Sequence, residues 1–104
     1  MMDSNQILYE VTVTVSVEID GAFRKYMVEK HIKEVIDTGY FLSATFARIV
    51  NGKYRTSYVA ADQVALNKYF AEHADRLRAD FNEHFPNGVS IYREEWLVLH
   101  HIAS

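Results

Sequence analysis

The sequence predicts an α+β domain whose strands and helices follow one another in the order β-α-β-β-α-β. Three features indicate this order: strict alternation of apolar and polar residues near the start, an Asn-Gly pair between two further strand-like segments, and two long amphipathic stretches with helical spacing. The chain has 104 residues, of which 49% are hydrophobic. Because this is the size of one domain with a real core, we expect residues 1–104 to form a single domain.

The first strand is expected to run from Ile7 to Glu18. Apolar residues, most of them β-branched, occupy every second position, which is typical of a strand with one fully apolar face. These positions are Ile7, Tyr9, Val11, Val13, Val15 and Val17. The opposite face is mostly hydroxyl and carboxylate, so we expect it to meet water, a polar cavity or a partner.

A first helix is expected from about Ala22 to Thr38. Asp20 is its candidate N-cap, and Gly39 lies where a left-handed residue commonly ends a helix. At 100° per residue, six side chains share one broad apolar face. They are Phe23, Met27, Val28, His31, Ile32 and Val35.

Residues 40–50 and 53–61 are expected to form two antiparallel neighbouring strands. The pair Asn51-Gly52 between them is typical of a type I′ hairpin turn, which needs a positive φ at both central positions.

The second helix is expected from about Gln63 to Phe85, with Asp62 as its N-cap. Its apolar stripe comprises Leu66, Phe70, Ala74, Leu77 and Phe81, with Tyr69 and Phe85 at the margins.

The last strand is expected from Val89 to Leu99. Its residues alternate, but neither face is purely apolar. A β-bulge or a second contact surface would explain this pattern.

Right-handed crossovers give this order one arrangement, a four-stranded antiparallel sheet with both helices on one face. This is the ferredoxin-like fold. The uncovered face still carries aromatic and apolar groups, and exposed apolar sheet surface usually marks a partner site. The simplest partner is a second copy, so we expect a homodimer formed through the open sheet face.

The sequence also resembles a family of short, mostly bacterial single-domain proteins of unknown function. The resemblance rests on segments that span nearly the whole chain: Tyr9-Glu10-Val11-Thr12-Val13, Tyr26-Met27, His31-Ile32, Thr38-Gly39-Tyr40-Phe41, Tyr69, His73-Ala74, Leu77-Arg78 and Arg93. Two positions depart from it, since Phe23 stands where relatives often have tryptophan and Lys33 where they often have proline. The resemblance implies a ferredoxin-like fold of the dimeric α/β-barrel type, and it supplies no activity, cofactor or catalytic residue.

His31 is the main candidate for chemistry, because it lies near the middle of the first helix's apolar face. A histidine there is either a hydrogen-bonded core residue or one that faces a cavity, where it can bind a ligand or transfer a proton. Tyr58, Arg93 and Trp96 are further candidate ligand-binding residues. Two of them have a structural alternative: Arg93 in a salt bridge, and Trp96 as an interface or barrel-lining aromatic.

Several function classes lack support in the sequence. The chain has no cysteine, and its formal net charge is −3, which gives no basic excess for nucleic acid. No apolar run approaches the roughly 20 residues that span a bilayer. His73 and His84 are too far apart along one helix to share a metal ion. We therefore expect no cofactor, metal, nucleic acid or membrane partner, and a cytoplasmic location.

Two functional hypotheses remain. The first is a homodimeric binding or interaction module without its own chemistry, favoured by the absence of catalytic motifs. The second is a cofactor-independent small-molecule enzyme, monooxygenase-like or isomerase-like, with a cavity between sheet and helices. This second hypothesis rests on analogy with the activities that dimeric α/β barrels host.

Overall fold

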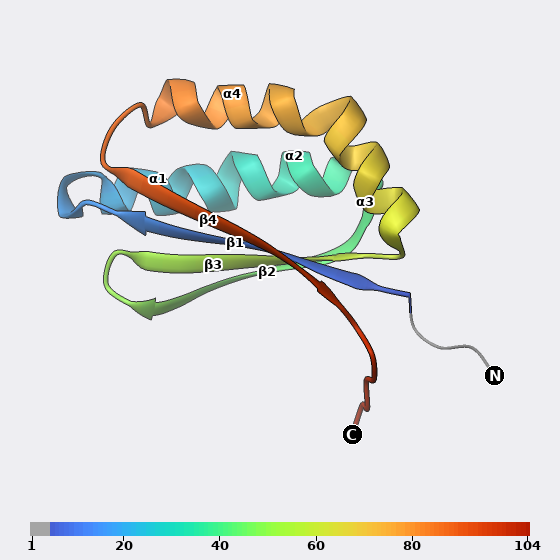
Figure 1. Cartoon of the computed structure of the whole chain (residues 1–104). Helices are drawn as coiled ribbons and strands as arrows, with labels where there is room; N and C mark the ends of the chain where they lie inside the picture. Colours follow the sequence, from blue (N-terminus) through green and yellow to red (C-terminus); the bar gives the residue numbers. More distant parts are fainter. Residues whose placement is uncertain (1–4) are drawn as a thin grey trace.

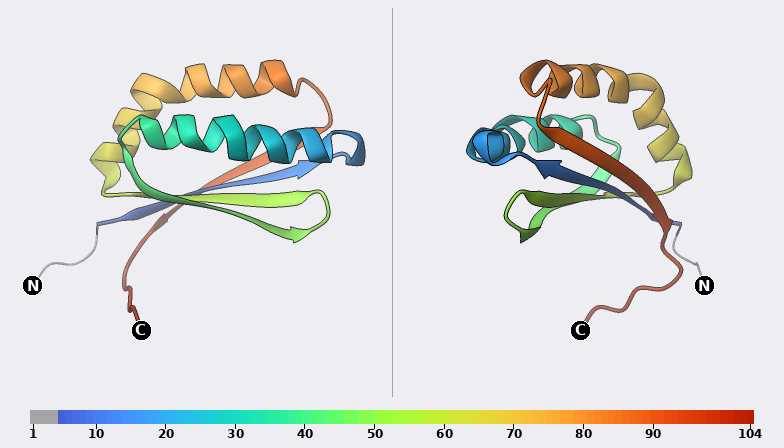
Figure 2. Two further views of the ribbon diagram at one scale, coloured as in Figure 1. Left: turned by 180° about the vertical axis from the view of Figure 1, so that it is seen from behind. Right: turned by 60° about the vertical axis from the view of Figure 1, so that its left-hand side comes forward.

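The fold is a two-layer α+β sandwich, seen in a computed structural model that describes residues 5–104. Four antiparallel strands form one sheet in the order β2-β3-β1-β4. The strands are β1 (Ile7–Val15), β2 (Phe41–Val50), β3 (Lys53–Ala60) and β4 (Val89–Leu97). Both helical runs cover the same face of the sheet (Figures 1 and 2). The predicted ferredoxin-like arrangement is thus confirmed.

Each helical run consists of two α-helices joined by a five-residue π-helical segment. The first run contains α1 (Asp20–Tyr26), η2 (Met27–His31) and α2 (Ile32–Asp37). The second contains α3 (Gln63–Tyr69), η3 (Phe70–Ala74) and α4 (Asp75–His84). A π-helical turn is wider than an α-helical turn and often occurs at a functional site. Figure 1 shows α3 and α4 meeting at an angle, with η3 between them.

The buried side chains form two adjoining clusters between the layers. One surrounds Tyr9, Tyr58 and Leu66, and the other surrounds Phe23, Tyr54 and Phe81. The stripe predicted for the second helix is confirmed, since its members are buried or pack against these clusters. On the first helix, Val28 was expected in the core and is instead 55% exposed. Val28 lies in η2, where the wider turn changes the 100° spacing on which the expectation rested.

The expected extent of the first strand is wrong at its C-terminal end. The strand stops at Val15, and Val17–Ile19 form a 3₁₀ turn (η1) that leaves Val17 84% exposed. This turn runs directly into α1, and the Asp20 amide donates to the Val17 carbonyl. Asp20 is therefore inside the helix and is not its N-cap; its carboxylate accepts a hydrogen bond from the Tyr54 hydroxyl.

The helix caps at Asp62 and Gly39 form as predicted, whereas the hairpin turn at Asn51-Gly52 differs in type from the prediction. Asp62 caps α3 as predicted, accepting a hydrogen bond from the Ala65 amide at 2.8 Å. Gly39 takes a positive φ of 84° after α2. The β2–β3 hairpin forms, but Gly52 has a positive φ of 82° and Asn51 does not, so the type I′ prediction is wrong.

The last strand ends at Leu97, short of its expected end at Leu99. Its register with β1 is continuous from Val89 opposite Val15 to Leu97 opposite Ile7, so the expected alternative of a bulge is wrong. Both of its faces are instead used, because alternate residues point toward the helices and toward the open side. Within residues 5–104, no helix is both long and apolar enough to cross a bilayer.

Candidate functional site

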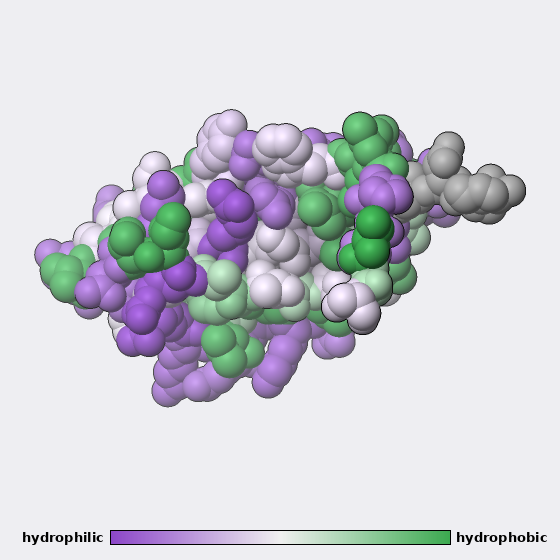
Figure 3. Space-filling model, turned by 90° about the horizontal axis from the view of Figure 1, so that it is seen from below, coloured by the Kyte–Doolittle hydropathy of each residue, from purple (hydrophilic) through white to green (hydrophobic). Residues whose placement is uncertain are grey.

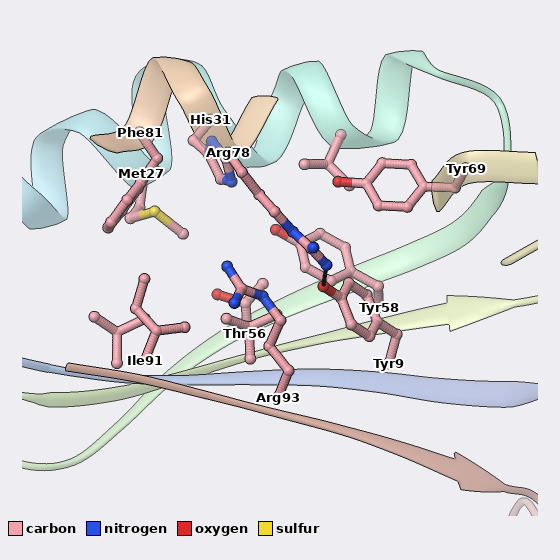
Figure 4. Close-up of a pocket in the computed structure, with 13 residues that line it drawn as sticks. Tyr9, Met27, His31, Thr56, Tyr58, Tyr69, Arg78, Phe81, Ile91 and Arg93 are labelled. Atoms are coloured by element: carbon pink, nitrogen blue, oxygen red, sulfur yellow. Dashed lines mark hydrogen bonds between the residues drawn. The ribbon is translucent and has the colours of Figure 1, made fainter. Parts of the chain in front are cut away.

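A pocket lies between the sheet and the two helical runs, near the middle of the sandwich (Figure 4). Three tyrosines, two arginines and one histidine supply its polar lining: Tyr9, Tyr58, Tyr69, Arg78, Arg93 and His31. Apolar side chains such as Met27, Phe81 and Ile91 complete the wall. Its cavity volume is about 40 Å³, which holds only a few water molecules.

His31 is the last residue of η2, and its side chain forms part of this wall. Its ring stacks on Tyr26, with ring centroids 5.6 Å apart, and meets the edge of Phe81 at 5.8 Å. The buried Nδ1 atom has no hydrogen-bond partner. A buried polar atom left without a partner costs about 1–3 kcal/mol. His31 is therefore a cavity-lining residue, and the alternative of a fully hydrogen-bonded core histidine does not describe it.

The imidazole of His31 is neutral at pH 7. Burial lowers its pKa from 6.5 to about 4, and the nearby charges of Lys30 and Arg93 also lower the pKa. Glu34 and Asp80 raise the pKa, by less than burial lowers it but by more than Lys30 or Arg93 lowers it. His31 therefore presents the pocket with a neutral group that can accept a proton.

Two guanidinium groups reach the pocket from opposite layers. Arg78 comes from α4 and donates a hydrogen bond to the Tyr9 hydroxyl at 3.0 Å, with its guanidinium 5.6 Å from the Phe70 ring centroid. Arg93 comes from β4 and is exposed. Figure 4 shows Arg78 extending down to Tyr9, whereas the Arg93 side chain rises from β4 toward the helical layer, below His31. Among the described residues, neither arginine has a carboxylate within ion-pair distance, and the pocket lining contains no aspartate or glutamate.

The three tyrosines form the far wall of the pocket. Tyr9 lies between the others, with ring centroids 6.0 Å from Tyr58 and 6.3 Å from Tyr69. Burial raises the pKa of Tyr58 far above its usual value and that of Tyr69 to about 12. Tyr58 and Tyr69 therefore add hydrogen-bonding capacity and no negative charge. The pocket as a whole is positive, with aromatic walls and a neutral base.

The open face of the sheet is the second surface of interest. Its register places Trp96, Leu8 and Val59 side by side across three strands, with Glu94, Glu10 and Ser57 in the next row. Glu10 accepts a hydrogen bond from Ser57 at 2.8 Å and lies 3.5 Å from the Arg55 guanidinium. Arg55 is thus a strand arginine that faces the open side of the sheet.

Comparison with known families identifies the chain. The model of a domain of unknown function, DUF4286, matches residues 6–100. The chain belongs to this family. A comparison with curated proteins gave no match.

Solved structures share the fold of this DUF4286 chain at low sequence identity. A dimeric ferredoxin-like protein from an uncultured marine organism has a TM-score of 0.76 and 14% identity, covering 93% of this chain and 98% of that one. SnoaB, a cofactor-independent oxygenase from Streptomyces nogalater, has a TM-score of 0.75 and 12% identity, with coverage of 96% and 99%. The ActVA-Orf6 monooxygenase of Streptomyces coelicolor, in complex with nanaomycin D, has a TM-score of 0.72 and 16% identity, with coverage of 97% and 94%. These similarities show the ferredoxin-like fold of the DUF4286 chain.

Three of the four candidate residues come together in the pocket. His31, Tyr58 and Arg93 all line it, whereas Trp96 is 54% exposed on the open face of the sheet. Alternation along β4 explains the separation, because Arg93 and Trp96 are three positions apart and so point to opposite faces.

Sequence reasoning did not assign Tyr9, Tyr69 and Arg78 to the site. Tyr9 could have been found, since it shares the apolar face of its strand and pairs directly with Tyr58. Arg78 lies three residues before Phe81, a spacing that puts both on one side of α4. Tyr9 and Arg78 line the same pocket only because α4 packs against the sheet.

Proposed function

We propose that this DUF4286 chain is a homodimeric binding protein that takes a small anionic molecule into the pocket between sheet and helices. The observation that carries the proposal is the pair Arg78 and Arg93, two guanidinium groups in a pocket without a carboxylate. A pair of guanidinium donors with no internal counter-charge is complementary to a carboxylate or another oxyanion. The lack of cysteine supports a cytoplasmic location as part of this proposal.

Entry of such a ligand requires a side chain to move. The cavity of about 40 Å³ is far below the several hundred Å³ typical of ligand sites. Arg93 is exposed and has no hydrogen bond or ion pair within residues 5–104, so nothing there holds its side chain in place. Rotation of Arg93 outward enlarges the pocket, and its return places the guanidinium on the ligand.

The binding proposal predicts a ligand-dependent shift in thermal unfolding. With benzoate as the probe anion, the wild-type midpoint rises with ligand concentration, because a ligand that binds only the folded state stabilises it. Arg93→Gln is expected to weaken benzoate binding at least tenfold, since one charge-assisted contact is lost. Arg76→Gln is the matched control, because Arg76 is an exposed arginine of α4 that does not line the pocket. Equal shifts in wild type and Arg93→Gln would contradict the proposal.

The homodimer is proposed to form through the open sheet face. Exposed Tyr92 and Trp96 lie on this face beside partly buried Leu8 and Val59. Figure 3 views the molecule from the sheet side and shows several separate apolar patches among polar side chains. Glu94 lies directly opposite Glu10 and has no ion-pair partner in the described chain, whereas Arg55 lies on the same face. A two-fold related copy can bring its basic residues to these carboxylates.

Light scattering tests the dimer directly. Wild type at micromolar concentration is expected to have twice the mass of one chain, and Trp96→Glu is expected to be monomeric because it adds a buried charge to the interface. Val28→Glu is the control, since Val28 is similarly exposed but lies on the helical layer. A monomeric wild type, or a dimeric Trp96→Glu variant, would refute the proposed interface.

Cofactor-independent catalysis is the second candidate function. The neutral, unpartnered imidazole of His31 favours it, because such a group can remove a proton from a bound substrate. The oxygenase and monooxygenase that share the fold support the idea by analogy only.

A further inference from the structure

The arginines and the histidine of the pocket favour different chemical properties in a ligand. Arg78 and Arg93 favour a negative oxygen, whereas the His31 imidazole is a neutral acceptor without a partner at Nδ1. A carboxylic acid is already ionised near neutral pH, so it satisfies the arginines and brings no proton to His31. A phenol or enol is neutral in solution, and it brings both a proton and an oxygen that becomes negative once the proton has left.

The walls of the pocket favour the phenol among these weak acids. The rings of Tyr9, Tyr58 and Phe81 line it, and aromatic side chains stack on planar aromatic ligands. Tyr58 and Tyr69 stay protonated, so their hydroxyls can donate to a phenolate oxygen. The pocket therefore has donors for the anion, an acceptor for the proton and flat surfaces for a ring.

We propose that the ligand of this pocket is a phenol that binds as its phenolate, with His31 keeping the proton. This inference rests on the anion-binding proposal and names the class of ligand. In the binding step the phenol O–H bond breaks and an N–H bond forms on the imidazole. The electron pair stays on the phenolate oxygen, where Arg78 and Arg93 hold it, so the step needs no oxidant, reductant or metal.

Burial is the largest influence on His31 and opposes this transfer, so the charges around the ring must offset it. Tyr26 and Phe81 pack on the ring from α1 and α4, and Arg78 of α4 lies across the pocket. Glu34 and Asp80 act to stabilise an imidazolium at this position, whereas Lys30 and Arg93 act to destabilise it. A phenolate bound beside the imidazole adds a negative charge at close range, which favours the imidazolium. Proton transfer and anion binding thus reinforce each other.

The probe for this inference is 4-nitrophenol, whose phenolate absorbs visible light and whose neutral form does not. At pH 5.5, where the free compound is largely neutral, wild type is expected to generate the phenolate band on binding. The apparent pKa of the bound phenol is expected to fall by at least one unit, a tenfold shift in its ionisation. Arg93→Gln and Arg78→Gln are expected to lose most of this shift, and Arg76→Gln is expected to keep it.

Calorimetry in different buffers measures how many protons are released on binding, and it tests the role of His31 separately. Binding to wild type at pH 5.5 is expected to give the same enthalpy in buffers with different ionisation enthalpies, because the proton stays on the protein. In His31→Gln any phenolate that binds must release about one proton to the buffer, so the measured enthalpies are expected to diverge. His100→Gln, a change in an exposed histidine of the C-terminal segment, is expected to behave as wild type.

The possible results separate the two proposals. If benzoate binds and 4-nitrophenol binds without a phenolate band, the phenolate inference is overturned and the anion site stands. If wild type forms the phenolate but releases a proton to the buffer, His31 is not the acceptor and the inference fails in that part. If neither probe binds at millimolar concentration, both the inference and the anion-binding proposal are wrong.

Discussion

Replacing Phe23 by alanine is expected to lower the free energy of unfolding by about 3–5 kcal/mol, the usual range for a buried phenylalanine. Phe23 is 0% exposed at the centre of an aromatic cluster. Its ring centroid lies 5.2 Å from that of Tyr54, 6.1 Å from that of Phe81 and 6.0 Å from that of Phe85. These neighbours come from β3, α4 and the end of the second helical run. The cavity left by the change would therefore lie between the sheet and the helices and remove contacts that join the two layers.

Chemical denaturation monitored by circular dichroism measures this loss, at one protein concentration because dimerisation contributes to stability. Phe23→Leu keeps most of the volume and is expected to lose clearly less than Phe23→Ala. Val17→Ala is the control for a surface site, since Val17 is 84% exposed, and it is expected to change stability by less than about 0.5 kcal/mol. A loss below about 1 kcal/mol for Phe23→Ala would show that Phe23 does not join the two layers as described.

The parts of the fold that sequence predicted well are those set by local periodicity. Period-two alternation placed β1 within residues 7–18, and a single side chain, Asp62, marked the start of α3. The errors occur where contacts distant in sequence decide the outcome. The β1 strand ends at Val15 because the Val15 amide donates to the Gly52 carbonyl and the Ser16 amide to the Gly88 carbonyl, after which the chain turns. No pattern within the strand reports these two contacts.

The same distinction explains the candidate site. His31 was found because a polar residue interrupts an apolar helical face, which is a local signal. The pocket's second arginine, Arg78, belongs to another helix, and its meeting with Tyr9 depends on how α4 packs over the sheet. Trp96 and Arg93 were both candidates and both lie on the last strand, but the pleat of that strand puts them on opposite faces.

The stability of the protein is expected to fall as the pH drops from about 6.5 to about 4, because of His31. In the unfolded chain this histidine has a pKa near 6.5, and in the folded chain burial lowers the pKa to about 4. Between these values the unfolded state binds a proton that the folded state does not, so acidification favours unfolding. A shift of about 2.5 pKa units corresponds to about 3 kcal/mol, fully present as stability above pH 6.5 and lost by pH 4.

Urea denaturation at several pH values between 7 and 4 tests this expectation on wild type and His31→Phe. Phenylalanine cannot bind a proton and leaves no unpartnered nitrogen. The free energy of unfolding of His31→Phe is therefore expected to change little with pH across this range. Asp80 does not obscure the comparison: hydrogen bonds from Lys30 and Tyr26 lower its pKa, so its contribution is lost only below the usual aspartate range. His100→Gln is the control that keeps the wild-type slope.

The direction of the pH effect also bears on the ligand site. Burial of an imidazole without a partner destabilises its charged form, and only a bound anion or a nearby carboxylate can offset that effect. A saturating anion is therefore expected to flatten the wild-type pH profile by raising the pKa of His31 in the folded state. If the anion stabilises the protein equally at pH 7 and pH 4.5, it does not bind next to His31, and the pocket between sheet and helices is not its site.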